Sequence, residues 1–163
     1  MKKNKWAKIA VAAVAVVVAF GAVSAISRNN DDEKVLNGWA YETCRLNDTT
    51  GKKDEDDKSG ISTKEFYEIE SLKSIKFTDE EAEGIEYYVN LYDEDKRFMS
   101  VEKQTGDFMA EDVNAAKVRG AAYFKVEIVD TEDEEISFFE KFGLSDKVAV
   151  KLDVSEDISE KGE

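Results

Sequence analysis

Three segments of the chain alternate between apolar and polar residues. They cover residues 85–91, 123–128 and 147–154. Because successive side chains of a β-strand point to opposite faces, a period of two predicts half-buried strands at these positions. A charged turn at residues 93–96 separates the first segment from a run that returns along it, so residues 84–103 are predicted to form a β-hairpin.

Shorter strands are predicted at residues 39–44, 65–69 and 72–77. Several short strands joined by turns, with little helix, predict an all-β fold. We expect an antiparallel β-sandwich over residues 35–155.

Within the body of the protein, helix is predicted in only two places. Thr131 and Glu134 have the spacing of a capping box, and apolar residues recur from there up to Gly143, which indicates a short helical turn. Residues 110–118 indicate another turn of the same kind.

Residues 1–26 follow a different pattern and predict one N-terminal apolar helix. Four lysines precede an unbroken apolar run at residues 9–23, and Val23, Ser24 and Ala25 give small residues at the spacing that signal peptidase needs. Two interpretations remain open. The segment is either a signal peptide cleaved after Ala25 or an uncleaved signal anchor, since residues 9–26 reach about 27 Å as a helix.

Both interpretations place the body of the protein outside the cytoplasm, because the lysines mark the cytoplasmic side. An uncleaved segment would hold the protein to the membrane, and a cleaved one would release it as a secreted protein. Residues 27–34 are expected to be a polar linker, and residues 156–163 a disordered acidic tail.

The charge of the body argues against a nucleic-acid partner. Residues 26–163 carry all 37 acidic side chains but only 19 of the 23 basic ones, which gives a formal charge of −18. The absence of histidine excludes triad catalysis and imidazole metal ligands. With one cysteine, Cys44, no internal disulfide can form, while intermolecular pairing stays open. No pair of acids stands in an apolar setting, so we expect no enzyme activity.

Two segments resemble jelly-roll modules of the carbohydrate-binding, galactose-binding-like type. Residues 87–100 resemble an apolar strand that ends in a Tyr-Asp-x-x-Lys-x-Phe turn, and residues 121–128 resemble a later Ala-x-Tyr strand of that group. The resemblance covers about residues 84–130. It implies a jelly-roll sandwich that binds sugars or proteins, or that serves as a spacer.

A candidate glycan site lies on the hairpin. Tyr88 and Tyr92 share the polar face of their predicted strand, with Asn90 between them, and such tyrosines stack on sugar rings when they are exposed. Trp39 and Tyr41 are candidates to extend the platform. The alternative is that these aromatic side chains pack in the sandwich or under a loop.

A candidate calcium site lies in the acidic loop at residues 54–66. Its candidate ligands are Asp54, Asp56, Asp57 and Glu65, which resemble an EF-hand loop around Gly60, although the spacing departs from that pattern by one residue. The alternative is a solvated acidic loop that requires no cofactor.

These features predict a non-catalytic recognition module outside the cytoplasm, at a bacterial-type cell envelope. The expected partner is a glycan. The alternatives are an envelope protein, for a structural module, and calcium, for an adhesion domain.

Overall fold

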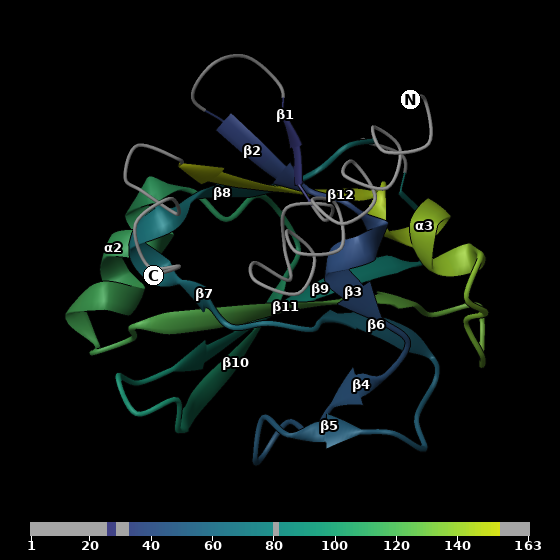
Figure 1. Cartoon of the computed structure of the whole chain (residues 1–163), viewed down its shortest axis with the longest axis horizontal. Helices are drawn as coiled ribbons and strands as arrows, with labels where there is room; N and C mark the ends of the chain where they lie inside the picture. The colour runs from purple at the N-terminus through teal and green to yellow at the C-terminus, as the bar shows by residue number, and fades with distance from the viewer. Residues whose placement is uncertain (1–25, 29–32, 80–81, 154–163) are drawn as a thin grey trace, which may run out of the picture.

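The structure is a computed structural model that describes residues 26–28, 33–79 and 82–153. The described residues form mostly antiparallel strands in two larger sheets, with few helices (Figure 1). The coarse prediction of a mostly antiparallel β protein is therefore confirmed. No helix among these residues is long and apolar enough to cross a membrane.

The first sheet has four strands in the order β1-β2-β12-β8. Their bounds are β1 (Ile26–Arg28), β2 (Glu33–Leu36), β12 (Val148–Asp153) and β8 (Leu72–Phe77). Strand β12 pairs with β2 on one side and with β8 on the other, in antiparallel register. The segment expected to be a linker thus contributes Ser27 and Arg28 of β1 and the first half of β2 to this sheet.

The second sheet has the order β10-β9-β11-β6-β3, and β7 pairs with β11 off this path. Its strands are β3 (Tyr41–Glu42), β6 (Gly60–Thr63), β7 (Tyr67–Glu68), β9 (Ile85–Tyr92), β10 (Phe98–Gln104) and β11 (Tyr123–Asp130). Strands β9 and β10 pair in antiparallel register, which confirms the predicted hairpin.

One hydrophobic core lies between the two sheets. Strands β9 and β11 supply residues at alternate positions, with Tyr87 opposite Ile128 and Val89 opposite Val126 in register. The four-stranded sheet supplies residues such as Ile75 and Val150 to the same cluster. The alternation seen in the sequence is therefore the pattern of a core-facing side.

A small hairpin, β4 (Arg45–Leu46) and β5 (Lys53–Asp54), forms a third layer. Figure 1 shows it on the side of the six-stranded sheet that faces away from β8 and β12. The face that the sequence marks as polar is therefore covered in part by this hairpin and its loops.

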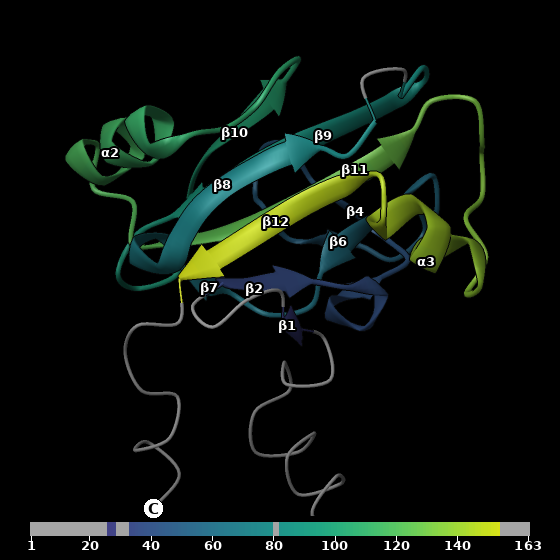
Figure 2. The same cartoon turned by 90° about the horizontal axis from the view of Figure 1, so that it is seen from above.

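The helical segments are short. They are α2 (Ala110–Val118), α3 (Glu140–Ser145) and the 3-10 turns η1 (Gly38–Ala40) and η2 (Ile69–Ser71). Figures 1 and 2 place α2 and α3 at opposite ends of the longest axis.

Two local expectations differ from the structure. The capping interactions before α3 are made by Ser137 and Glu140, whose side chains each accept the other's backbone N–H, and Gly143 lies inside the helix. The strand expected at residues 39–44 is reduced to β3, because Asn37 caps η1 by accepting the N–H of Trp39. The predicted N-terminal helix and acidic tail lie outside the described residues.

Candidate functional site

The five residues predicted to bind a ligand do not form one exposed surface. The side chain of Tyr41 is fully buried in the core, and Asn90 and Tyr92 are 1% and 2% exposed. Tyr88 is half-buried, and its hydroxyl donates to Glu86 Oε2 at 2.8 Å. Of the five, Trp39 alone is exposed, at 51%.

The β4–β5 hairpin explains this burial. Tyr92 lies on the outer face of the six-stranded sheet, and its hydroxyl donates to the backbone oxygen of Gly51, in the loop between β4 and β5, at 2.8 Å. Gly51 has φ +63° and approaches the Phe98 ring and the Tyr92 hydroxyl so closely that a Cβ would overlap them. Tyr92 therefore packs under a loop and Tyr41 packs in the sandwich core, which is the alternative that the sequence left open.

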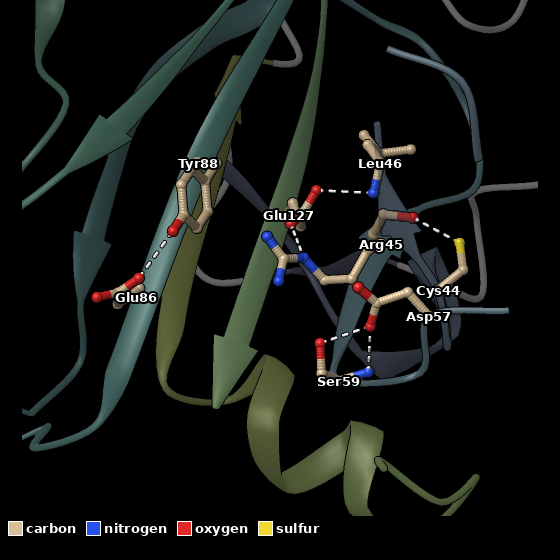
Figure 3. A network of polar contacts seen from close by, with 9 residues as sticks. Cys44, Arg45, Leu46, Asp57, Ser59, Glu86, Tyr88 and Glu127 are labelled. Carbon is tan, nitrogen blue, oxygen red and sulfur yellow. Dashed lines mark hydrogen bonds and ion pairs between the residues drawn. The ribbon is translucent and has the colours of Figure 1, made fainter. Parts of the chain in front are cut away.

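An ion pair joins this hairpin to the sheet. The Arg45 Nε donates to Glu127 Oε1 on β11, and the Leu46 N–H donates to Glu127 Oε2 at 2.9 Å (Figure 3). The Arg45 guanidinium also lies 5.5 Å from the centre of the Tyr88 ring. Burial raises the pKa of the Glu127 carboxyl, while Arg45 and the Leu46 N–H act in the opposite direction.

More polar groups are buried on the same face. The Cys44 Sγ and the Ser62 Oγ are 3.1 Å apart, and burial raises the pKa of the Cys44 thiol. The Lys125 Nζ donates to the Lys64 oxygen at 3.2 Å and lies 4.6 Å from the centre of the Phe66 ring. Burial lowers the pKa of the Lys125 ammonium. These polar groups are therefore buried between the six-stranded sheet and the segments that cover it.

Asn90 is the exception in this layer. Neither its amide oxygen nor its amide nitrogen has a hydrogen-bond partner within the described part of the chain. Its register partner on β11 is Lys125, whose ammonium is directed to Lys64 instead. An amide that is buried without partners carries a free-energy penalty.

The calcium-ligand candidates are only partly brought together. Asp54, Asp56 and Asp57 line an open depression of about 480 Å³ together with Lys58, Glu134 and Glu135, whereas Glu65 is not among the lining residues. The Ser59 N–H and hydroxyl donate to Asp57 Oδ1, and the Asp56 N–H donates to Asp54 Oδ1. No group of three or more carboxylate or thiol side chains in the described residues is placed to hold a metal ion.

Four aromatic side chains gather on one surface of the described chain, and we call them the aromatic cluster: Trp39, Phe138, Phe139 and Phe142. Trp39 belongs to η1, and the three phenylalanines lie just before and within α3. Phe138 and Phe139 are 53% and 82% exposed, and the described chain has no exposed aromatic residue outside this cluster. We therefore take the aromatic cluster as the candidate functional site.

The rings of the aromatic cluster pack edge to face. The Trp39 ring centre lies 5.1 Å from Phe142 and 6.3 Å from Phe138, with interplanar angles of 74° and 68°. Phe138 and Phe139 are 5.5 Å apart at 83°. The rings therefore form a ridged surface and not the flat stack on which a sugar ring lies.

The aromatic cluster packs against the side chain of a buried lysine. Lys141 is 3% exposed, and its Nζ donates to the backbone oxygen of Tyr41 at 3.1 Å. The same ammonium lies 4.5 Å from the Phe138 ring centre and 5.1 Å from that of Phe142. Burial lowers the pKa of this ammonium. These cation–π contacts hold the rings in place while their outer edges stay in solvent.

Comparison with known proteins gives no relative. No family model matches the chain, and neither a curated protein nor a solved structure matches it. The site is therefore interpreted from its own geometry.

The phenylalanines of the aromatic cluster were not predicted as binding residues from the sequence. Their signal was the pair Phe138-Phe139, because two adjacent residues at the start of a short helix cannot both face the core. Their proximity to Trp39 could not be read from the sequence, since about a hundred residues separate them.

Proposed function

We propose that the protein is a non-catalytic recognition module that works outside the cytoplasm and binds its partner through the aromatic cluster. The observation that carries the proposal is the grouping of Trp39, Phe138 and Phe139, all more than half exposed, on one edge of the domain. Leaving such rings in water costs free energy that a partner surface recovers.

The ridged packing of the rings favours an apolar partner surface. Rings at 68° to 83° to each other present edges and short grooves, which fit aliphatic groups better than the flat face of a pyranose. Three parts of this proposal rest on the sequence alone. They are the place of the domain outside the cytoplasm, its N-terminal signal or anchor, and its resemblance to jelly-roll carbohydrate-binding modules.

Site-specific photocrosslinking tests the proposal. Benzoylphenylalanine is placed at position 139 in the full chain and, as a control, at position 118, because Val118 is 88% exposed at the far end of α2. In intact cells we expect crosslinks from position 139 and few from position 118. Equal labelling at the two positions, or none at position 139, would show that the cluster is not the contact surface.

Glycan binding is the second candidate, and the half-exposed Trp39 is the observation that favours it. A single indole can stack on one sugar ring, although the neighbouring rings do not extend the platform. A glycan array probed with the protein and with Trp39→Ala tests this candidate. Glycan binding that Trp39→Ala abolishes would support it, and an array without any bound glycan would remove it.

A further inference from the structure

We infer that the partner of the aromatic cluster is the surface of a lipid bilayer, the one in which the uncleaved N-terminal apolar segment is anchored. The inference rests on the proposed function and names its partner. It assigns the domain a second attachment point to the membrane, in addition to the N-terminal apolar segment, which ends before β1.

Very little chain separates the N-terminal apolar segment from the first strand of the fold. Strand β1 begins at Ile26, and only Ser24 and Ala25 separate it from the apolar run that ends at Val23. Two extended residues reach about 7 Å. Because Ile26 begins β1, an anchor helix extends no further than Ala25, and residues 9–25 reach about 26 Å, near the short end of what spans the hydrocarbon. Such an anchor leaves no linker, and the part of the domain next to Ile26 must lie at the headgroups.

Ile26 lies beside the elements that carry the aromatic cluster. In the register of the first sheet, Ile26 is the partner of Leu36. Trp39 follows Leu36 by three residues, in η1, and α3 packs against η1 with the Phe142 ring directly over Gly38. The aromatic cluster therefore lies beside the point where the apolar segment enters the fold.

The side chains of the aromatic cluster are of the kind found at the boundary of a bilayer. Aromatic side chains, Trp above all, are favoured at the boundary between hydrocarbon and headgroups. Glu134, Glu135 and Glu140 are exposed nearby in the sequence and repel anionic headgroups, so the proposed contact depends on insertion of the rings and not on charge. Tethering raises the effective concentration of the cluster at the bilayer, so that shallow insertion of a few rings is sufficient.

The far end of the domain provides a control surface. Figure 2 shows α2 and α3 at opposite ends of the molecule, with β1 at the lower edge between them. Val118 is the last residue of α2 and is 88% exposed. A reporter at that position shares the tether and the solvent exposure but should not reach the bilayer.

The test uses the full chain in phosphatidylcholine nanodiscs that contain lipids brominated near the headgroups. The chain has two tryptophans, so Trp6→Phe leaves Trp39 as the only reporter. We expect the brominated lipids to remove most of the Trp39 emission, and high salt to leave this quenching unchanged. In the control, Trp6→Phe and Trp39→Phe are combined with Val118→Trp, whose emission should be insensitive to bromine.

Phe139→Asp supplies a variant that keeps the fold, because this side chain is 82% exposed. It should weaken the quenching of Trp39, since a carboxylate replaces an inserted ring. Unquenched Trp39 in brominated nanodiscs, or a mature protein whose mass shows cleavage after Ala25, would overturn the inference. If position 139 still crosslinks to a protein or glycan in cells in that case, the proposed surface stands and only the lipid partner is wrong.

Discussion

Arg45 on β4 and Glu127 on β11 form an ion pair that ties the small hairpin to the outer face of the six-stranded sheet. The two partners differ in exposure, with 20% of the Arg45 side chain and 1% of the Glu127 side chain in contact with solvent. The pair therefore sits at the boundary of the layer, with the carboxylate on the inside.

Removing Arg45 should destabilise the domain strongly. In Arg45→Ala the Glu127 carboxylate stays buried without its counter-charge, and we expect the free energy of unfolding to fall by about 3 kcal/mol. Urea denaturation measures this change. The matched control is Arg97→Ala, whose side chain is 73% exposed and pairs with Asp93, and whose loss should cost about 1 kcal/mol or less.

A double variant separates two contributions to this loss of stability. One is the unpaired Glu127 carboxylate, and the other is the lost packing of the Arg45 side chain. If the penalty comes from the unpaired carboxylate, adding Glu127→Gln to Arg45→Ala should recover part of the lost stability. Equal stability of the single and double variants would assign the loss to packing of the arginine stem instead.

Replacing Asn90 with an apolar residue should stabilise the protein. Its amide is buried and lacks hydrogen-bond partners in the described residues, so Asn90→Val removes unpaired polar atoms from a strand position that favours β-branched residues. We expect a gain of about 1 kcal/mol in thermal or urea unfolding. A comparable loss would mean that the amide is satisfied by an ordered water in solution.

The sequence predicted which residues share a face but not which faces are covered. Alternation along β9 correctly separated Tyr87 and Val89 from Tyr88 and Asn90. The polar set was expected in solvent, whereas the β4–β5 hairpin covers it. A period of two reports the pleat of a strand, and a covering layer of charged and small residues leaves no periodic signal.

The alkaline limit of stability follows from the buried tyrosines. Burial raises the pKa of Tyr41, Tyr87 and Tyr92 above that of an exposed tyrosine, and that of Tyr88 to about 12. The unfolded chain loses these protons near pH 10, while the folded chain retains them. The unfolded state therefore binds fewer protons there, and stability falls as the pH rises above about 10.

The measurement compares tyrosinate absorbance with far-ultraviolet circular dichroism through an alkaline titration. We expect most of the absorbance change to coincide with the loss of β-structure, because the buried tyrosines ionise as the fold opens. Complete tyrosine ionisation in a protein that keeps its β-structure would contradict this prediction.

Calcium should leave the stability of the described fold unchanged. Asp54 and Asp57 accept hydrogen bonds within their own turns, and no group of acids in the described residues is placed to bind a metal ion. We expect the same melting temperature with calcium and with a chelator. A higher melting temperature in calcium would revive the calcium-stabilised adhesion domain, and Asp57→Asn should then abolish the difference.

The close approach of η1 and α3 should depend on Gly38. A Cβ at this position would overlap the Phe142 ring, so Gly38→Ala forces that ring away from Trp39. We expect the free energy of unfolding to fall by about 1 to 3 kcal/mol, as for other overpacked sites, together with a changed Trp39 emission in the Trp6→Phe background.

Gly143→Ala is the matched control, because a Cβ there meets no atom within 4 Å and Gly143 lies inside α3. That substitution should raise stability by about 1 kcal/mol through helix propensity. Equal behaviour of the two variants would show that the contact between Gly38 and Phe142 does not hold the aromatic cluster in place.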